Sequence, residues 1–341
     1  MEFREKVPLA SFTTFKIGGP ARWFAEASNE EDILEAVRFA RGRELPLFIL
    51  GGGSNLLVSD DGFPGLVLHV ANTGIDQQED TFRVAAGEDW DRFVFHAVAK
   101  NYAGIECLAG IPGTVGGTPV QNVGAYGQEV SETIAAVRVL DLATLGFEEM
   151  SPQACRFAYR RSIFNWSERG RYIVTRVDYA LRKDGEPRIA YADLKKHFAG
   201  AASPSLAEAS AAVRSIRHQK GMLIVADDPD CRSAGSFFKN PVISASRYAA
   251  IAAQYDGEVP HYAASDGEIK LPAAWLLDQA GFHKGYTFGQ AGISSRHTLA
   301  LINKGQAKAA DILALRDRIV AEVEAKFGIR LEPEPVIVGL G

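Results

Sequence analysis

The sequence predicts an α+β fold with more than one domain. Roughly the first hundred of its 341 residues alternate strand-like and helix-like segments, and the last hundred form a second mixture of helices and strands. Two glycine-rich runs, 51–55 and 109–129, interrupt the hydrophobic segments of the first half. With 47% hydrophobic residues, the chain has enough apolar surface for two or three domain cores.

The N-terminal part reads as a small α+β unit that ends near residue 72. The segment 21–27 is expected to be a strand. Ser28 and Glu31 predict a capping box at the start of the next helix, whose apolar face carries Ile33, Leu34, Val37 and Phe39. The segments expected as further strands are 46–50, 55–59 and 65–70, and the loop GGGSN at 51–55 follows the first of them.

The middle of the chain is expected to carry a strand at 81–86 and a helix at 88–100, followed by the run 109–129, with further strands at 135–141 and 171–182. The segment CRFAYRRSIF, 155–164, belongs to neither of the last two strands. A helix is predicted from Ser203 to about His218, with Pro204 at its first helical position. The acidic, proline-containing loop that follows places a domain junction near residue 228.

The last third reads as a separate α+β unit. Helices are expected at 242–254, 272–280 and 306–327, and a core strand at 298–303. The final segment, 328–341, is a strand broken by Pro333 and Pro335 and is too short to form a unit alone, so we expect it to return to another part of the molecule.

Composition excludes several classes of protein. The net charge of −5 and the absence of basic tracts argue against a nucleic-acid partner. The first residues are charged where a signal peptide would be apolar, and no run reaches the ~18 apolar residues of a membrane span, so we expect a cytoplasmic protein. We also expect a monomer, although no feature of the sequence determines the oligomeric state. The cysteines and histidines lack metal-ligand spacing; Cys107 and Cys155 are expected as buried free thiols and Cys231 in a loop.

The run 109–129 carries six glycines and two prolines and almost no charge, which favours a buried cradle for a cofactor over a solvated linker. The loop GGGSN offers successive backbone N–H groups for an anion, although a triple glycine alone is more often a tight turn. Neither loop completes a P-loop or the fingerprint G-x-G-x-x-G before a helix. A dinucleotide held between the two loops is the remaining interpretation.

The loops belong to a longer series of motifs: GGGSNLLVSD at 51–60, GIPGTVGGTPVQNVGAYGQE at 110–129, FAYRRSIF at 157–164, AGSFFKNP at 234–241 and LEPE at 331–334. In this order they resemble the UDP-N-acetylenolpyruvoylglucosamine reductase family, in its longer subclass with a tyrosine-bearing loop. The resemblance implies non-covalent FAD in the two-subdomain fold of the vanillyl-alcohol-oxidase type, at 1–72 and 73–227. It also implies a substrate-binding domain at 228–327 and a last strand, 328–341, that returns toward the flavin site.

The family uses NADPH to reduce the enolpyruvyl ether of UDP-N-acetylglucosamine enolpyruvate to a lactyl ether, in peptidoglycan precursor synthesis. Hydride addition leaves negative charge near the substrate carboxylate and a carbon that needs a proton. Ser236 matches the family's proton donor, with Lys239 and Asn240 as candidate supports; alone it would read as a turn residue. Arg160 matches the arginine that polarises the carboxylate, and Glu334 matches the glutamate that hydrogen-bonds the enolic intermediate. Glu332 is expected to face the other way and to be structural.

The remaining site predictions also follow from the resemblance. The residues expected to contact the UDP-sugar are Tyr159, Tyr191, Lys220, Asn240, Tyr262 and His297, with Lys220 at the diphosphate. The residues expected to contact FAD are Gly51, Gly52, Gly53, Ser54, Asn55, Pro112, Gly113, Gly116, Gly117, Asn122, Gly124, Ala125, Tyr126 and Arg217.

Two other functions stay open from the sequence. A flavin oxidase of an alcohol or sugar would share the glycine loops but would have no reason to carry AGSFFKNP or LEPE. A flavin or nucleotide carrier without catalysis would bind the cofactor and turn nothing over.

Overall fold

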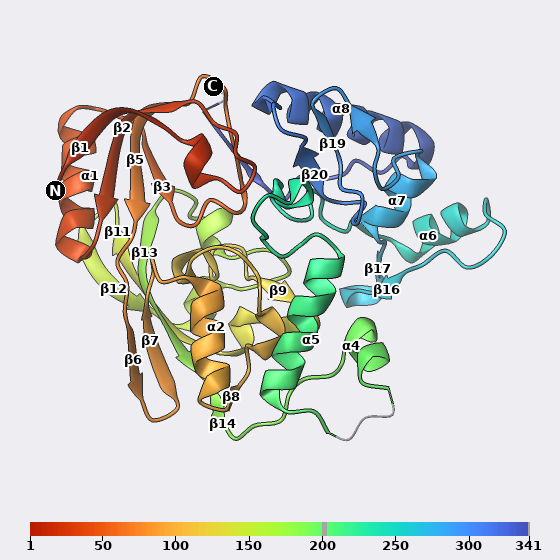
Figure 1. The fold of residues 1–341 in the computed structure, drawn as a ribbon, viewed down its shortest axis with the longest axis horizontal. Helices are drawn as coiled ribbons and strands as arrows, with labels where there is room; N and C mark the ends of the chain where they lie inside the picture. Colours follow the sequence, from red (N-terminus) through yellow and green to blue (C-terminus); the bar gives the residue numbers. More distant parts are fainter. Residues whose placement is uncertain (200–202, 340–341) are drawn as a thin grey trace. The chain divides into compact units, whose positions relative to one another are not determined.

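The computed structural model describes residues 1–199 and 203–339, and the chain forms two compact units (Figure 1). The first unit is built from Met1–Val7, Ala21–Gly53 and Phe63–Gln219, and the second from Pro8–Pro20, Ser54–Gly62 and the chain from Lys220 onward. Each unit has its own hydrophobic core. The domain limits predicted at residues 72, 227 and 327 stay predictions.

The first sheet of unit 1 has the strand order β1-β2-β5-β3, and β2 and β3 both run parallel to β5. Its strands are β1 (Phe3–Pro8), β2 (Pro20–Ala27), β3 (Leu47–Leu50) and β5 (Phe63–Val70). Helix α1 (Glu30–Gly42) buries Ile33, Ala36, Val37 and Ala40, which recur at helical spacing, in the core of this unit (Figure 1). The predicted strands and helix are therefore confirmed here.

The predicted cap of α1 is wrong by one residue. Asn29, not Ser28, is the N-cap, and its Oδ1 accepts a hydrogen bond from the backbone N–H of Asp32 at 2.8 Å. The Ser28 N–H in turn donates to Asp32 Oδ2 at 2.9 Å. Ser and Asn are both strong caps, so two of them in succession leave the start of a helix ambiguous in the sequence.

The second sheet of unit 1 is antiparallel, with the order β12-β11-β13-β7-β6. Its strands are β6 (Ile75–Gln78), β7 (Thr81–Ala85), β11 (Ile134–Asp141), β12 (Gly146–Met150) and β13 (Tyr172–Ala180). Two short pairs complete the unit: β8 (Tyr102–Ala103) with β14 (Arg182–Lys183), and β9 (Gly124–Ala125) with β10 (Gln128–Glu129). Strands β6 and β12 had no counterpart in the sequence prediction.

The other helices of unit 1 are α2 (Trp90–Ala99), α3 (Pro152–Cys155), α4 (Ala192–His197) and α5 (Leu206–Gln219). The predicted start of α5 is wrong, because Pro204 lies outside the helix. Ser205 and Glu208 form the capping box: the Glu208 N–H donates to Ser205 Oγ at 3.2 Å and the Ser205 N–H donates to Glu208 Oε2 at 2.8 Å. This reciprocal pair fixes the start of the helix beyond the proline.

The described part of unit 2 contains three small sheets and three α-helices. The strands β18 (Thr287–Phe288), β19 (Ala291–Ile293) and β20 (Leu301–Asn303) are antiparallel, as are β15 (Val242–Ile243), β17 (Ile269–Lys270) and β16 (Tyr262–Ala263). The helices are α6 (Ala245–Ala252), α7 (Ala273–Gln279) and α8 (Ala309–Phe327). The strand predicted at 298–303 starts only at Leu301, since the Ala300 N–H closes a turn onto the His297 carbonyl.

The last described segment pairs with residues from early in the chain. Strand β21 (Val336–Val338) runs parallel to β4 (Leu56–Val58), and both belong to unit 2. The predicted segment 328–341 is described as far as residue 339. The expectation that it returns to another part of the chain as a strand is confirmed. None of the helices in the described ranges is both long enough and apolar enough to cross a membrane.

Candidate functional site

The two glycine loops contact each other through their backbones in unit 1. A Cβ added at Gly52 would lie 2.6 Å from Gly113 Cα, and one added at Gly51 would lie 2.8 Å from Thr114 Oγ1. Real Cβ atoms do not approach other atoms so closely, so any side chain at Gly52 would push the loops apart. The structure therefore brings together Gly51–Gly53 and Pro112–Gly113, which were predicted to share one cofactor.

Two adjacent glycines of the second loop differ in their surroundings. A Cβ at Gly116 would lie 2.6 Å from the Cβ of Ala86, whereas a Cβ at Gly117 would have no protein atom within 4 Å. Gly117 thus presents bare backbone to open space. This is the feature that a flat ligand needs for close approach to the main chain, and it fits the dinucleotide that the sequence predicts.

The entry to the second loop is held by an ionic cluster that the sequence analysis missed. The Gly110 N–H donates to Asp91 Oδ1 at 2.6 Å, and Arg217 Nε donates to the Gly110 carbonyl at 3.1 Å. Arg214 forms an ion pair with the other oxygen of Asp91. Burial lowers the pKa of Arg217, and the neighbouring Tyr126 and Asp91 oppose that shift. The three-residue spacing of Arg214 and Arg217 on a helix was the signal available in the sequence.

Asn122 joins the second loop to the turn that carries Arg160. Its Nδ2 donates to Glu129 Oε2 at 2.8 Å and to the Ala158 carbonyl at 3.1 Å, and its Oδ1 accepts the Ser131 N–H at 3.2 Å. The side chain is buried. Asn122 thus supports the shape of the loop through contacts with protein groups.

Tyr159 and Arg160 are the central residues of a tight turn. The backbones of Ala158 and Arg161 exchange two hydrogen bonds, of 2.9 and 3.0 Å. Arg160 has φ = 54°, in the left-handed region that non-glycine residues rarely adopt, and its carbonyl accepts a hydrogen bond from Asn165 Nδ2 at 3.1 Å. Strained backbone that is held by its surroundings is common at functional sites, which agrees with the role predicted for Arg160.

Ser236 and Glu334 lie on paired segments of unit 2. Phe238 and Pro333 form an antiparallel bridge, the Glu334 N–H donates to the Phe237 carbonyl at 2.8 Å, and the Lys239 N–H donates to the Glu332 carbonyl at 3.0 Å. In this register Ser236 and Glu334 lie at the same end of the paired segments. The structure therefore brings together two of the three predicted catalytic residues.

Asn55 connects this pair of segments to the first glycine loop. Its Nδ2 donates to the Glu334 carbonyl at 3.3 Å, and its own carbonyl accepts the Val336 N–H at 2.9 Å. The Ser54 carbonyl accepts a hydrogen bond from Thr14 Oγ1 at 3.4 Å. GGGSN thus gives its three glycines to unit 1 and its two polar residues to unit 2.

The two candidate supports of Ser236 have other contacts. Lys239 Nζ lies 3.3 Å from Glu332 Oε2, and the Glu332 side chain is 75% exposed, in agreement with the structural role predicted for Glu332. Asn240 Oδ1 accepts the Ala273 N–H at 2.9 Å and so caps the first turn of α7.

The remaining predicted residues are found in both units. In unit 1, Gly124 and Ala125 form β9, and the ring of Tyr126 lies edge-on to that of Tyr191, with centroids 5.3 Å apart. In unit 2, Tyr262 is 53% exposed on β16, and His297 lies in the turn between β19 and β20. Their roles stay predictions.

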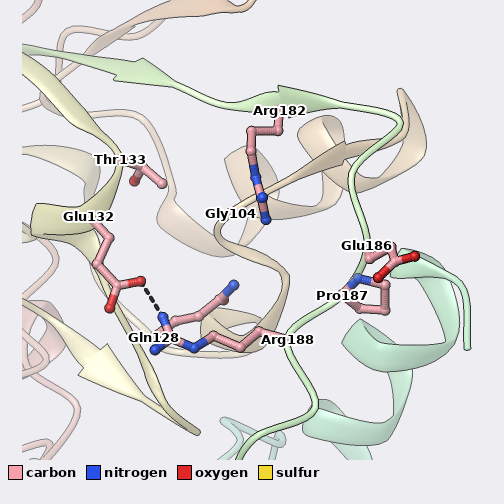
Figure 2. A pocket seen from close by; sticks show the side chains of 8 residues that line it. All are labelled: Gly104, Gln128, Glu132, Thr133, Arg182, Glu186, Pro187 and Arg188. Carbon is pink, nitrogen blue, oxygen red and sulfur yellow. Dashed lines mark hydrogen bonds and ion pairs between the residues drawn. The ribbon is translucent and has the colours of Figure 1, made fainter. Parts of the chain in front are cut away.

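One pocket of unit 1 is lined by none of the predicted site residues. It encloses about 470 Å³ and is lined by Gly104, Gln128, Glu132, Thr133, Arg182, Glu186, Pro187 and Arg188 (Figure 2). An ion pair of 2.5 Å joins Arg188 to Glu132 at its edge. Its acidic and basic side chains balance, so its charge favours no ligand class. In the part of the chain that the structure describes, no cluster of three His, Cys, Asp or Glu side chains could bind a metal.

Comparison with known proteins shows the family. Residues 21–144 match the FAD binding domain family, and residues 227–338 match the C-terminal domain of UDP-N-acetylenolpyruvoylglucosamine reductase. The reductase of Thermobifida fusca is 44% identical over 99% of this chain and 98% of its own, and that of Nocardia farcinica is 45% identical over 99% and 90%. The crystal structure of the Thermus caldophilus reductase superimposes with a TM-score of 0.70 at 28% identity, over 99% of this chain and 100% of its own.

These matches confirm the predicted fold class, in which an FAD-binding part is followed by a separate α+β domain. They extend over both units and over all the motifs on which the prediction depended. The chain belongs to the UDP-N-acetylenolpyruvoylglucosamine reductase family.

Proposed function

We propose that this protein uses NADPH and FAD to reduce UDP-N-acetylglucosamine enolpyruvate to UDP-N-acetylmuramate. The observation that carries the proposal is the pairing of the Ser236 segment with the Glu334 segment, tied by Asn55 to the first glycine loop. The proposed proton donor and the proposed catalytic glutamate thus lie on paired segments of unit 2, and one of these segments contacts Asn55, a residue predicted to bind FAD. A flavin oxidase or a flavin carrier would have no use for this arrangement.

The residues present fit FAD. Two glycine loops in backbone contact, with Gly117 facing open space, leave room for a flat ligand against the main chain. Arg217 and Asp91 hold the Gly110 peptide from both sides and fix the entry of the second loop. The chemistry that FAD supplies when bound is hydride transfer, from NADPH to the vinyl carbon of the substrate.

The protein's own residues supply binding, polarisation and a proton. Arg160 binds the substrate carboxylate through its planar guanidinium and stabilises the negative charge that develops there. Ser236 Oγ gives its proton to the vinyl carbon that does not receive the hydride, and Glu334 hydrogen-bonds the enolic form of the substrate. The turn that fixes Arg160 and the pairing that fixes Glu334 reduce the reorganisation needed before reaction.

The substrate side of the proposal concerns the nucleotide. Lys220 contacts the diphosphate, and Tyr159, Tyr191, Asn240, Tyr262 and His297 contact the UDP-sugar. A net charge of −5 supports an enzyme that does not bind nucleic acid. We also propose that it is cytoplasmic, binds no membrane and acts as a monomer. Light scattering after size-exclusion chromatography tests the monomer, because a dimer would double the measured mass.

The decisive experiment follows NADPH oxidation at 340 nm with and without the enolpyruvyl UDP-sugar. The proposal requires oxidation that depends on the sugar nucleotide, and the product must contain a lactyl ether by mass spectrometry. Rapid oxygen consumption by the reduced protein without the sugar nucleotide would identify an oxidase instead. A colourless protein that takes up no FAD would contradict every flavin function.

A further inference from the structure

The loop 221–232, which the proposed mechanism does not use, is fastened to the β19–β20 turn by an ionic cluster in unit 2. Arg296 forms ion pairs with two aspartates of the loop, through Nε with Asp230 Oδ2 at 3.0 Å and through Nη2 with Asp228 Oδ2. Asp230 also accepts hydrogen bonds from the Ser295 N–H at 3.2 Å and from Ser295 Oγ at 2.7 Å. The turn therefore holds the loop through two nitrogen atoms, Nε and Nη2, of the Arg296 guanidinium.

The cluster lies against the residue that follows Lys220. A Cβ added at Gly221 would lie 3.1 Å from Arg296 Nε and 3.3 Å from the Cβ of Asp230. Gly221 has φ = 65°, which few other residues adopt without strain. Because the guanidinium packs on the Gly221 backbone, the position of Lys220 depends on where Arg296 lies.

The same turn fixes the residue that follows Arg296. The backbone N–H groups of Arg296 and His297 both donate to Ser294 Oγ, at 3.0 and 3.3 Å. His297 Nδ1 accepts the Leu299 N–H at 3.1 Å, which assigns the proton of the neutral ring to Nε2. Lys220 and His297 are thus sequence neighbours of the two groups that meet, Gly221 and Arg296.

Asp230 is suited to a fixed pairing rather than a changing one. The side chain is 9% exposed, and both of its oxygens accept hydrogen bonds. Burial alone would raise the pKa of Asp230, but hydrogen bonds from Ser295 and Arg296 outweigh it and lower that pKa. Removing one partner of a buried ion pair leaves the other charge uncompensated, so the cluster should resist rearrangement.

We propose that Arg296 is a positioning residue for the nucleotide substrate: through Asp228 and Asp230 it holds the loop 221–232, and so presents Lys220 and His297 to the diphosphate. This inference rests on the proposed function, which supplies the diphosphate. It gives the loop a role that its sequence does not reveal. Arg296 itself does not touch the substrate in this account.

The test compares holoenzyme variants by titration with UDP and with uridine, which lacks the diphosphate. Arg296→Gln should weaken UDP binding about tenfold, the scale of one lost hydrogen-bonded charge contact, and leave uridine binding unchanged. In turnover, the KM for the sugar nucleotide should rise by a similar factor, while the KM for NADPH and kcat stay within about twofold. The matched control is Arg330→Gln, which breaks an exposed pair with Glu324 and should change none of these values.

A double-mutant cycle then separates positioning from simple packing. In a background that carries both Lys220→Ala and His297→Ala, Arg296→Gln should cause little further loss of UDP affinity, because Arg296 acts through these two residues. Multiplicative losses, or equal losses for UDP and uridine, would overturn the proposal. If Arg296→Gln fails to fold, Asp228→Asn removes only the Nη2 partner and makes the same test. If the wild type oxidises NADPH in a sugar-dependent reaction but Arg296→Gln binds UDP as tightly as the wild type, only the positioning role of Arg296 is rejected. If the wild type shows no sugar-dependent NADPH oxidation, the proposed function and the positioning role are both rejected.

Discussion

The side-chain amide of Asn55 donates a hydrogen bond of 3.3 Å to the carbonyl of Glu334, although 279 residues separate the two. The Val336 N–H completes the contact by donating to the Asn55 carbonyl at 2.9 Å. A residue predicted to bind FAD therefore fixes the backbone of a residue predicted to act on the substrate. A substitution at Asn55 should therefore change the backbone position of Glu334, and a substitution at Glu334 should change that of Asn55.

Ser236→Ala should separate the two halves of the reaction. Flavin reduction by NADPH should remain nearly intact, whereas reoxidation by the sugar nucleotide should slow by at least ~100-fold, the usual scale for the loss of a general acid. Stopped-flow absorbance at 450 nm measures both rates. Ser236→Cys, which keeps a proton donor, should recover part of the second rate. Equal losses in both halves would mean that Ser236 only supports the site.

Gly117→Ala should weaken FAD binding without weakening the fold. The new methyl group would meet no protein atom within 4 Å, so the urea midpoint of the apoprotein should not change, but it would fill space that the ligand needs. We expect the Kd for FAD, from fluorescence quenching, to rise at least ~10-fold. An unchanged Kd would place the cofactor away from Gly117.

Gly52→Ala and Gly42→Ala are the variants to compare with Gly117→Ala. At Gly52 the methyl group would lie 2.6 Å from Gly113 Cα, so both the urea midpoint and the affinity for FAD should fall. A methyl group at Gly42, the last residue of helix α1, would have no neighbouring atom within 4 Å. The urea midpoint and the affinity for FAD should therefore not change in Gly42→Ala. If Gly52→Ala were as stable as the wild type, the contact between the two loops would not matter for the fold.

Asp91→Ala should raise the Kd for FAD about tenfold, because the Gly110 N–H would lose its acceptor and Arg214 its partner. Titration of the apoprotein with FAD measures the effect. Arg92→Ala is the control, since the neighbouring Arg92 side chain is 76% exposed and pairs only with Glu88 among the ion pairs of the described residues. Equal Kd values for Asp91→Ala and the wild type would show that the second loop keeps its shape unaided.

Glu30 should make the stability of unit 1 sensitive to acid. Arg138 holds both of its carboxylate oxygens, at 2.7 and 3.0 Å, and Thr175 Oγ1 donates to one of them at 2.7 Å. Burial alone would raise the pKa of Glu30, but these partners outweigh it and lower that pKa. The stabilisation is therefore complete above the ordinary glutamate pKa of about 4.3 and is lost as the pH falls through the lower pKa of the folded protein.

Urea unfolding between pH 3 and pH 7 tests this expectation. Glu30→Gln should be less stable than the wild type at pH 7, and the difference should shrink below about pH 4.3. Glu31→Gln, at an exposed neighbouring position, should follow the wild-type curve. A constant difference between Glu30→Gln and the wild type at every pH would exclude the assigned ion pair.

The three cysteines should resist alkylation in the native protein. All three are buried, and burial raises the pKa of Cys107 and of Cys155 to about 12. At pH 8 their thiols are therefore protonated and covered. Iodoacetamide should add no label before unfolding and three labels after it, as counted by mass spectrometry.

The sequence predicted those elements whose pattern is local. Helix α8 shows its apolar face at three- and four-residue spacing, and strand β13 alternates, so both could be read directly. The start of α1 could not, since Ser28 and Asn29 cap equally well and only the contacts of Asp32 decide between them. Strand β12 escaped because most of its residues are exposed and show no hydrophobic period.

The site residues that belong to a sequence motif could be predicted, whereas the residues that act through a contact between distant segments were missed. Ser236 and Arg160 were found through short runs that resemble a family, but the contacts that hold the neighbouring loops come from elsewhere in the chain. Asp91, on helix α2, accepts a hydrogen bond from the Gly110 N–H, and Arg296 binds Asp230, from which it is separated by 66 positions in the sequence. No local sequence pattern predicts such pairs, because the two residues are far apart in the sequence and meet only when distant segments pack together.

The parallel pairing of β21 with β4 also bears on how the chain folds during synthesis. Residues 8–20 and 54–62 leave the ribosome early, but they pack in unit 2, most of which begins at Lys220. These two segments can contact each other early, through the Gly19 N–H and the Ser59 carbonyl, but β4 cannot pair with β21 until residue 338 has emerged. Unit 1 can therefore fold first, while these two segments of unit 2 stay outside it as loops of the chain. Translation speed, or a chaperone that shields Leu57 and Phe15, should then govern the yield of active protein.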